Sequence, residues 1–260
     1  MTGKVYLVGA GPGDPKLITV KGVECLKESD VIIYDRLVNK QLLSYAKQDC
    51  ELIFCGKFPK KHTMRQEQIN ELLVKKAKDG KIVTRLKGGD PCVFGRVGEE
   101  AVFLRKHGVP FEIVPGITAG IAAPAYAGIP VTHRDYGSTF TIVTGTTSHE
   151  EKQAEEKWKA LATGVDTIAF YMGITNLPSI CEKLIQFGRK KETPAAVIEW
   201  GTMPEQRTVT GTLETIAAKA ERARISHPAI ILVGNVVQLH DKISWFRKGF
   251  TNETENDERD

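Results

Sequence analysis

The chain of 260 residues contains no apolar run that approaches the ~20 residues needed to cross a bilayer. It also shows no secretory signal, because Met1 to Lys4 lead directly into the apolar run Val5–Val8 without a small-residue cleavage site. Neither a secreted nor a membrane-spanning protein is indicated. We therefore expect a cytoplasmic protein with no membrane contact.

Cysteine is scarce and is not arranged for metal binding. The chain has five cysteines, an odd number, and no two of them form the close pair typical of zinc sites. His62 and His133 likewise have no second histidine or cysteine at ligand spacing. We expect no metal site, and reduced structural thiols at Cys25, Cys50, Cys55, Cys92 and Cys181.

The net charge is only mildly basic, at +4, and the basic residues are spread along the chain. A nucleic-acid-binding protein usually shows a denser basic stripe or a known reading module, and the sequence shows neither. Hydrophobic residues make up 41% and charged residues 26%, which is ordinary for a globular protein with a buried core. We expect one large domain or two modest ones, and no nucleic-acid partner.

Short apolar runs alternate with amphipathic stretches, a pattern typical of α/β chains. In the helix expected at 69–78 the apolar residues share one face, and Gly80 follows its end. The first half is predicted to contain strands at 5–8, 31–34, 51–54, 82–86 and 111–114, and helices at 17–27 and 69–78.

A segment rich in Gly, Ala and Pro at 115–137 separates this half from a second alternation of strands and helices. We interpret it as a hinge between two α/β domains, 1–114 and 138–241; a plain linker with a short helix is the alternative. The strand at 207–210 follows the strand at 195–199 so closely that antiparallel pairs are expected. The remaining predictions are strands at 139–144, 167–171 and 229–233, helices at 155–161, 177–187 and 213–222, and a disordered acidic tail at 251–260.

The most informative segment is Arg85–Arg96, in which two glycines, an aspartate and a proline directly follow a buried-strand pattern. Adjacent glycines at the carboxyl end of a strand let a ligand approach the backbone where a Cβ atom would collide. Asp90 would then lie beside bare backbone groups, where it can accept from a ribose diol or pair with an ammonium group. A tight strand-to-helix turn capped by Asp90 explains the same residues without a ligand.

An earlier glycine-rich loop, Gly9–Pro15, also lies between an expected strand and an expected helix. A dinucleotide-binding fingerprint needs its third glycine where the helix packs on the strand. Here Asp14 follows Gly13 and would place a negative charge near a pyrophosphate. A phosphate-loop lysine followed by Ser or Thr is also missing. A NAD(P)- or nucleotide-binding protein is therefore only a distant alternative.

The segment Arg85–Arg96, continued by Gly98-Glu99-Glu100, resembles the signature of the tetrapyrrole methylase family, and within it of the uroporphyrinogen-III C-methyltransferase branch. Val97 departs from that signature, which has a glycine there. Further blocks match in the right order, so the resemblance runs from about Val5 to Leu239 and is far more specific than one glycine motif. These blocks are Val8–Pro15, Tyr34–Val38, and Val114–Ala119 continued by Gly128–Arg134.

The resemblance implies an S-adenosylmethionine-dependent methyltransferase of two α/β domains, with the cofactor site in the cleft between them and S-adenosylhomocysteine as the product. It also implies a homodimer. The length of the chain leads us to expect a methylase without the fused dehydrogenase and ferrochelatase of some relatives. The residues that the resemblance assigns to the cofactor are Pro12, Gly88, Gly89, Asp90, Val93, Thr118 and Ala119 in the first half, and Met172, Gly201 and, as a weaker candidate, Ala229 in the second.

Holding the methyl donor and the acceptor carbon in line is the main requirement of such a reaction, and can account for roughly 7–11 kcal/mol of the barrier. When the acceptor is an electron-rich pyrrole carbon, a proton must later leave, and a carboxylate base suits that step. Asp35 follows the strand at 31–34, and the resemblance assigns it as proton acceptor and Lys57 as proton donor. Alternatively, Asp35 forms a local ion pair with Arg36, and Lys57 binds a substrate carboxylate.

The activity that the resemblance implies is methylation of uroporphyrinogen III at C2 and C7, by way of precorrin-1, to precorrin-2 for sirohaem or cobalamin biosynthesis. This substrate is a polycarboxylate, so cations should gather near its site and attract it less strongly as salt rises. A sister methylase acting on a later precorrin or cobalt-precorrin is the nearest alternative, and a scaffold role has little support. The expected substrate-binding residues are Arg36, Lys57, His133 and Arg134.

Overall fold

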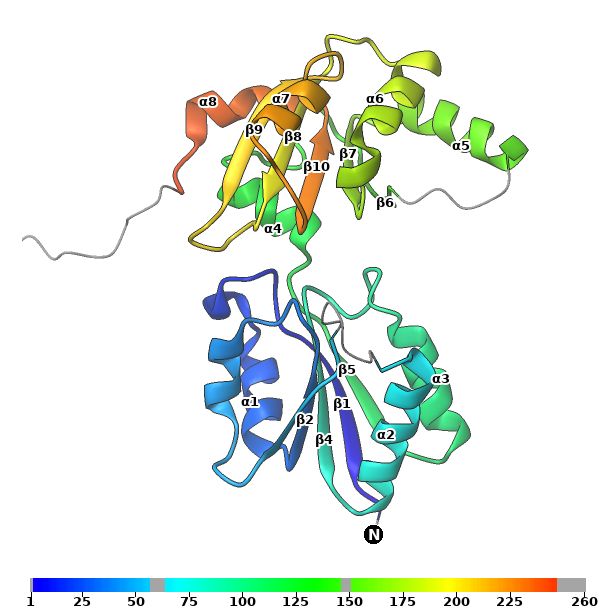
Figure 1. The fold of residues 1–260 in the computed structure, drawn as a ribbon, viewed down its shortest axis with the longest axis vertical. Coiled ribbons are helices and arrows are strands. Elements are labelled where there is room, and N and C mark those ends of the chain that lie inside the picture. Colours follow the sequence, from blue (N-terminus) through cyan, green and yellow to red (C-terminus); the bar gives the residue numbers. More distant parts are fainter. Residues whose placement is uncertain (1, 57–63, 146–150, 247–260) are drawn as a thin grey trace, which may run out of the picture. The chain divides into compact units, whose positions relative to one another are not determined.

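The computed structural model describes residues 2–56, 64–145 and 151–246. The chain divides into two compact units, Met1–Ala119 and Gly120–Asp260, and each has its own sheet (Figure 1). Each unit also has its own hydrophobic core. The division falls inside the segment 115–137 that the sequence predicts as a hinge. Lys57 and the predicted tail at 251–260 lie outside the described residues.

The first unit contains a five-stranded sheet. Its strands are β1 (Lys4–Gly9), β2 (Val31–Tyr34), β3 (Glu51–Phe54), β4 (Ile82–Lys87) and β5 (Phe111–Val114), as the sequence predicts. They lie in the order β3-β2-β4-β1-β5, and every neighbouring pair is parallel. The inner strands are mostly apolar because both faces of such a sheet are covered by helices.

The helical segments of this unit are η1 (Pro15–Leu17), α1 (Val20–Glu28), η2 (Lys40–Tyr45), α2 (Gln66–Lys78) and α3 (Val97–Lys106), where η marks a 3-10 turn. Helices lie on both sides of the sheet (Figure 1). Leu26 of α1 packs with Ile32 on one face, whereas Leu73 of α2 and Leu104 of α3 pack with Ile33 on the other. Successive side chains of β2 point to opposite faces of the sheet, so this strand contributes to two separate cores.

Capping groups explain why two helices begin at other residues than predicted. The Thr19 hydroxyl accepts from the Gly22 amide at 3.0 Å and starts α1 there, so Leu17 falls in η1 instead. The Arg65 amide donates to Gln68 Oε1 at 2.8 Å, and α2 starts at Gln66, earlier than its apolar period indicates. The sequence did not predict α3, because its first turn contains a glycine and two glutamates and shows no apolar period.

The second unit contains a mixed five-stranded sheet. Its strands are β6 (Phe140–Thr144), β7 (Thr167–Tyr171), β8 (Pro194–Glu199), β9 (Arg207–Thr212) and β10 (Ala229–Val233). They lie in the order β6-β7-β10-β8-β9. β6 and β7 are parallel, whereas β10 is antiparallel to β7 and β8, and β8 is antiparallel to β9. The antiparallel pairs predicted for this sheet are confirmed.

The helical segments of this part are α4 (Ala119–Tyr126), α5 (Glu151–Gly164), η3 (Ile174–Asn176), α6 (Leu177–Gln186), α7 (Ile216–Arg222), η4 (Asn235–Leu239) and α8 (His240–Ile243). Phe170 of β7 is fully buried and packs in one core with Leu184 of α6 and Ile216 of α7. Across the described parts of the chain, no helix has both the length and the hydropathy of a membrane span.

Glu112 on β5 gives the first unit a measurable dependence on pH. It pairs with Lys21 of α1 and, at 2.6 Å, with Lys4 of β1. Hydrogen bonds from Lys21 and Lys4 lower the pKa of Glu112 to about 2 from the ordinary 4.5. Because the folded pKa lies below the unfolded one, the pairs stabilise the protein above about pH 4.5, and this stabilisation is lost as the pH falls toward 2.

We expect Glu112→Gln to lower the free energy of unfolding at pH 7 by only about 0.5–1 kcal/mol, since solvent screens these partly exposed pairs. The difference from wild type should shrink as the pH approaches 2. Urea denaturation of both proteins across this range measures it. A difference that is the same at every pH would show that the charge of Glu112 is not its cause.

Candidate functional site

The loops after β1, β2, β4 and β5 carry the residues that the sequence predicts as functional in the first unit. Since these strands are parallel, their carboxyl ends lie at one edge of the sheet, where ligands of α/β proteins usually bind. The loops begin at Ala10, Asp35, Gly88 and Pro115. The fold therefore brings residues that are far apart in the sequence to one edge.

Three of these loops pack backbone against backbone. The Gly11 amide donates to the Gly89 carbonyl at 3.2 Å, and the Gly89 amide donates to the Gly11 carbonyl at 2.7 Å. A Cβ atom on Gly116 would lie 2.4 Å from the Gly89 oxygen, and one on Gly9 would lie 2.6 Å from the Gly116 Cα. A side chain does not fit between backbones at this spacing, so contact between the loops requires these glycines.

Asp90 joins two of the loops through its carboxylate. Its Oδ2 accepts from the Gly116 amide at 2.9 Å, and its Oδ1 accepts from the Cys92 amide at 2.7 Å. The turn interpretation therefore describes what Asp90 does within the chain. An ionised carboxylate has about four acceptor positions, so these two bonds leave capacity for a ligand. The cofactor contact of Asp90 stays a prediction.

The backbone at Gly89 has room for a Cβ atom without a collision. Gly89 has a φ of +69°, and a Cβ atom there would find its nearest neighbours, Ala119 N and Thr118 Cα, 4.0 Å away. Thr118 is itself buried. Three residues predicted to bind the cofactor, Gly89, Thr118 and Ala119, are thus close neighbours.

The other predicted cofactor residues of this unit lie in the same loops. Pro12 is half-buried in the loop after β1. A Cβ atom on Gly88 would lie 2.8 Å from the Leu37 Cβ, so a larger residue there would push against the loop after β2. The Val93 amide donates to the Asp90 carbonyl at 3.2 Å, and the Val93 side chain is half-buried. The sequence motifs therefore converge in one region of the first unit.

The turn beyond Asp90 contains strained backbone. Phe94 and Arg96 have φ values of +53° and +57°, a conformation that is costly for residues other than glycine and is often found at functional sites. Val97, which departs from the family pattern, is buried in the core that α2 and α3 share. The turn is therefore compatible with a valine at position 97.

The Gly9–Pro15 loop is not arranged as a phosphate-binding loop. It leads into η1, where Asp14 Oδ1 accepts from the Lys16 amide at 2.8 Å, and α1 begins only at Val20. In dinucleotide-binding proteins the pyrophosphate sits at a helix N-terminus directly after the glycines. Here η1 separates the two, which argues further against the nucleotide alternative.

Asp35 lies directly after β2, with 30% of its side chain exposed. Its Oδ1 accepts from the Leu37 amide at 3.2 Å, and its Oδ2 lies 3.7 Å from Arg85 Nη2. Arg36 is exposed, and a pair between Asp35 and Arg36 is not among the ion pairs of the described residues. Among the described residues, the ionic partner of Asp35 is therefore Arg85 of the neighbouring strand β4, which corrects the local pair considered from the sequence.

Arg85 belongs to a buried group of charges that the sequence analysis did not identify as functional. Arg85 Nε donates to Glu100 Oε1 at 3.2 Å, and Lys87 Nζ donates to the same oxygen at 2.9 Å. Burial, followed by the charge of Arg85, lowers the pKa of Lys87. The sequence did contain an indication of this group. Arg85 and Lys87 are two residues apart in one strand, so their side chains point to the same face of the sheet.

In the second unit, Met172, Gly201 and Ala229 lie at one edge of the sheet. Met172 directly follows β7, Gly201 follows shortly after β8, and Ala229 begins β10, which pairs with both strands. Met172 is exposed and has a φ of +53°. A Cβ atom on Gly201 would lie 2.3 Å from the Ala123 Cβ of α4, so only glycine fits there. Three predicted residues from distant parts of this unit are thus brought together.

His133 and Arg134 lie in a tight turn. The His133 amide donates to the Gly137 carbonyl at 2.9 Å, and the Gly137 amide donates back at 3.0 Å. His133 Nδ1 accepts from the Asp135 amide at 3.1 Å, which holds the ring within the turn. Arg134 is exposed. The turn thus presents a cation to solvent, as a polycarboxylate substrate requires.

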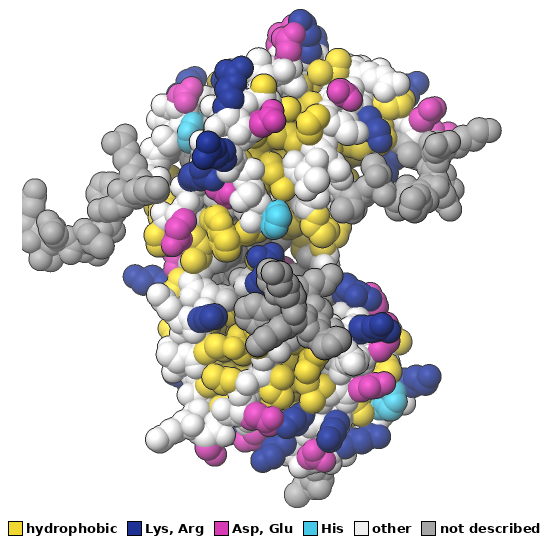
Figure 2. Space-filling view, viewed as in Figure 1, with side chains coloured by type: hydrophobic (Ala, Val, Ile, Leu, Met, Phe, Trp, Pro, Cys, Tyr) yellow, Lys and Arg dark blue, Asp and Glu magenta, His cyan; other side chains and the backbone are white. Residues whose placement is uncertain are grey.

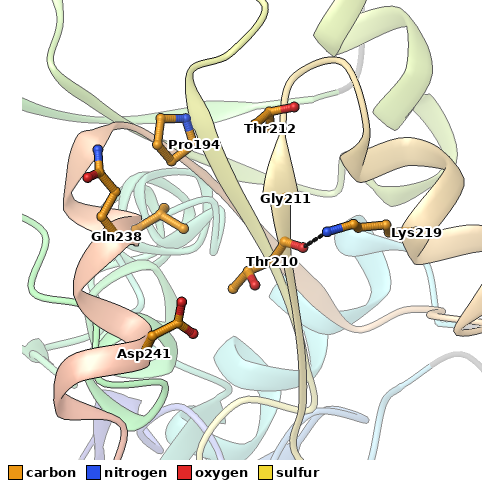
Figure 3. A pocket seen from close by; sticks show the side chains of 8 residues that line it. Pro194, Thr210, Gly211, Thr212, Lys219, Gln238 and Asp241 are labelled. Carbon is orange, nitrogen blue, oxygen red and sulfur yellow. Dashed lines mark hydrogen bonds between the residues drawn. The ribbon is translucent and has the colours of Figure 1, made fainter.

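A pocket of about 270 Å³ lies elsewhere in the second unit, and Figure 3 shows its lining. Lys219 at its margin donates to the Thr210 carbonyl at 3.1 Å and is engaged within the chain. None of the residues predicted as functional lines this pocket, so we assign it no ligand. The lining residues are Pro194, Thr210, Gly211, Thr212, Lys219, Val237, Gln238 and Asp241.

Charged side chains of both signs are interspersed on the face of the molecule drawn in Figure 2. Among the residues that the structure describes, no group of three or more His, Cys, Asp or Glu side chains is gathered as a metal site requires. The described cysteines are all free. The candidate site is therefore described by its loops and by the buried group of Arg85, Lys87 and Glu100.

Comparison with known proteins shows the family to which this chain is related. The model of the Tetrapyrrole (Corrin/Porphyrin) Methylases matches residues 4–217. A uroporphyrinogen-III C-methyltransferase of Bacillus subtilis (strain 168) is 58% identical over 244 residues, which are 94% of this chain and 95% of that protein.

Two solved structures share the fold. The uroporphyrin-III C-methyltransferase of Thermus thermophilus, complexed with S-adenosylhomocysteine, is 38% identical with a TM-score of 0.77, and the match covers 91% of this chain and 100% of that chain. A cobalt-precorrin-4 methyltransferase is 31% identical with a TM-score of 0.80, over 90% of this chain and 95% of that chain. The chain therefore belongs to the tetrapyrrole (corrin/porphyrin) methylase family.

Proposed function

We propose that this protein transfers methyl groups from S-adenosylmethionine to C2 and C7 of uroporphyrinogen III, giving precorrin-2 by way of precorrin-1. The observation that carries the proposal is the 58% identity, along almost the whole chain, to a protein named for that substrate. The product would serve the biosynthesis of sirohaem, of cobalamin, or of both.

The first unit has the features that the cofactor needs. S-adenosylmethionine would supply a methyl group on a sulfonium, which departs as a neutral thioether. Its adenosine and amino acid groups call for backbone donors, backbone acceptors and a carboxylate, and the neighbouring residues Gly89, Thr118 and Ala119 offer backbone groups beside Asp90. We assign the same role to Pro12, Gly88 and Val93 of this unit, and to Met172, Gly201 and Ala229 of the second.

Asp35 is our candidate for the base that removes the proton from the methylated ring carbon. At 3.7 Å, Arg85 is too far from Asp35 Oδ2 to form a hydrogen bond with it. Asp35 is also partly exposed at the edge of the sheet where the predicted cofactor loops lie. Lys57, which follows β3, is proposed as the proton donor.

The substrate carboxylates call for cations that remain accessible. Arg36 and Arg134 are exposed, and His133 is half-buried in its turn. We propose that these residues and Lys57 bind the carboxylates of uroporphyrinogen III. Their attraction acts at a distance and weakens with salt, so it guides the substrate to the site more than it fixes the reacting carbon.

A sister methylase that acts on a later precorrin or cobalt-precorrin is the second candidate, because one such enzyme shares the fold. The higher sequence identity to the uroporphyrin-III enzyme favours the first candidate. We further propose that the protein forms a homodimer, as the family resemblance implies, and that it acts in the cytoplasm, as expected from the sequence.

The decisive experiment is anaerobic incubation of the protein with uroporphyrinogen III and S-adenosylmethionine, followed by mass analysis of the tetrapyrrole. We expect a gain of two methyl groups, and no gain when S-adenosylmethionine is omitted. Binding of S-adenosylhomocysteine without methylation of uroporphyrinogen III would assign the substrate to a sister enzyme. Binding of NAD in place of S-adenosylhomocysteine would support the nucleotide alternative.

A further inference from the structure

We propose that Arg85, anchored by Glu100, is a positioning residue that holds the Asp35 carboxylate in the orientation needed to remove the proton. The inference rests on the proposed function, because it takes Asp35 as the base. It concerns side chains behind the site, whose exposed fractions are 4% for Arg85 and 0% for Glu100. These side chains act through Asp35 and are not expected to touch the substrate.

The position of Arg85 is fixed by bonds to other groups. Its Nε donates to Glu100 Oε1 at 3.2 Å, and its Nη1 donates to the carbonyls of Ile33 at 3.3 Å and Leu86 at 3.1 Å. Because the guanidinium is planar and rigid, fixing Nε and Nη1 also fixes the direction of Nη2. Nη2 is the nitrogen that lies 3.7 Å from Asp35 Oδ2.

Glu100 is held in turn by both helices of its face of the sheet. It extends from α3, and its Oε1 also accepts from Lys87 Nζ at 2.9 Å and from Gln66 Nε2 of α2 at 3.1 Å. Gln66 also donates to Asn70 on its own helix at 3.0 Å. The anchor of Arg85 is therefore built from two helices and the central strand β4, not from a mobile surface pair.

The distribution of charge makes Asp35 part of this group. Arg85 and Lys87 share one buried carboxylate, Glu100, and a buried cation is costly unless it faces an opposite charge. Asp35 provides the second carboxylate. Its Oδ1 is bound by the Leu37 amide at 3.2 Å, so the attraction of Arg85 for Oδ2 fixes the carboxylate plane at its other end.

The test compares methylation of uroporphyrinogen III by the wild type, Arg85→Met, Asp35→Asn and the double variant. Methionine keeps the apolar stem and leaves Glu100 paired with Lys87. Because Asp35 would be displaced in Arg85→Met, the kcat of this variant should fall by about 100-fold. KM and the calorimetric binding of S-adenosylhomocysteine should change little. In the Asp35→Asn background, Arg85→Met should have almost no further effect, because its contribution passes through Asp35.

Two further variants complete the test, one as a control and one as a replacement for Arg85→Met. Glu112→Gln removes an ion-paired glutamate of the same sheet outside the site and should keep the kcat of wild type. If Arg85→Met does not fold, the pair Lys87→Met with Glu100→Gln removes one buried charge of each sign and takes away the anchor of Arg85. Thermal unfolding establishes that each variant is folded, and the same loss of kcat is expected for the pair.

The outcomes separate this inference from the proposed function. A wild type that does not methylate uroporphyrinogen III would overturn the proposed function and this inference with it. An active wild type with an unchanged kcat in the folded Arg85→Met protein would overturn the inference alone. So would losses that multiply in the double variant, since Arg85 would then act independently of Asp35.

Discussion

Asp35→Asn is expected to lower kcat for methylation of uroporphyrinogen III by roughly 100- to 10,000-fold, the contribution of a positioned general base. Asparagine has nearly the same shape, and its side-chain oxygen can still accept from the Leu37 amide, so the loop after β2 should keep its conformation. The amide cannot take up the proton that leaves the ring. S-adenosylhomocysteine should therefore bind as it does to the wild type, and steady-state kinetics should show the loss in kcat.

The matched control is Asp30→Asn at the opposite end of β2. Asp30 Oδ2 accepts from the Ile82 amide at 2.8 Å, and this backbone bond, followed by the bond from Lys47, lowers the pKa of Asp30. Loss of that charge should reduce thermal stability and leave kcat nearly unchanged. Nearly equal kcat values for Asp35→Asn and wild type would show that Asp35 only orients the substrate or has no role.

Gly116→Ala is expected to destabilise the protein by about 1–3 kcal/mol, because the new methyl group has no room. The added Cβ would lie 2.4 Å from the Gly89 oxygen and 2.9 Å from the Gly9 Cα, and both are backbone atoms that can move only with their loops. The loops must separate, which changes the space beside Gly89. We therefore expect affinity for S-adenosylhomocysteine to fall at least about ten-fold, a loss of about 1.4 kcal/mol, measured by calorimetry.

Gly98→Ala provides the comparison, because the same methyl group is added without a collision. Gly98 lies in the first turn of α3, and a Cβ atom there meets nothing within 4 Å. Alanine should raise the free energy of unfolding by up to about 1 kcal/mol through its higher helix propensity, and leave S-adenosylhomocysteine binding unchanged. If Gly116→Ala binds the ligand as tightly as Gly98→Ala, contact between the loops does not shape the site.

The strands and the positions of the loops could be predicted because their signals are local. A buried parallel strand is a short apolar run, and the adjacent glycines at 88 and 89 mark its carboxyl end. The role of Asp90 was only half predictable. Its turn is encoded by neighbouring residues, whereas its bond to the Gly116 amide depends on the pairing of β4 and β5 with β1.

The group of Arg85, Lys87 and Glu100 was not predicted as part of the site, since the sequence does not show which charges face each other. Glu100 lies on a helix that the sequence analysis missed, and its partners Arg85 and Lys87 precede it on the strand β4. The partner of Asp35 was mistaken for the same reason. The adjacent Arg36 was the obvious candidate in the sequence, but the pairing of β2 with β4 brings Arg85 to Asp35.

The strand order of the first unit constrains how the chain folds during its synthesis. β1 is made first, yet it lies between β4 and β5, the last two strands of that sheet to leave the ribosome. A nascent chain that ends before β5 would expose one side of β1, and exposed strand edges invite pairing with other chains. Once Val114 has emerged, the unit can close around β1 while the second unit is still being translated. The loops that contact one another at Gly11, Gly89 and Gly116 would then be formed before Met172 or Gly201 has been synthesised.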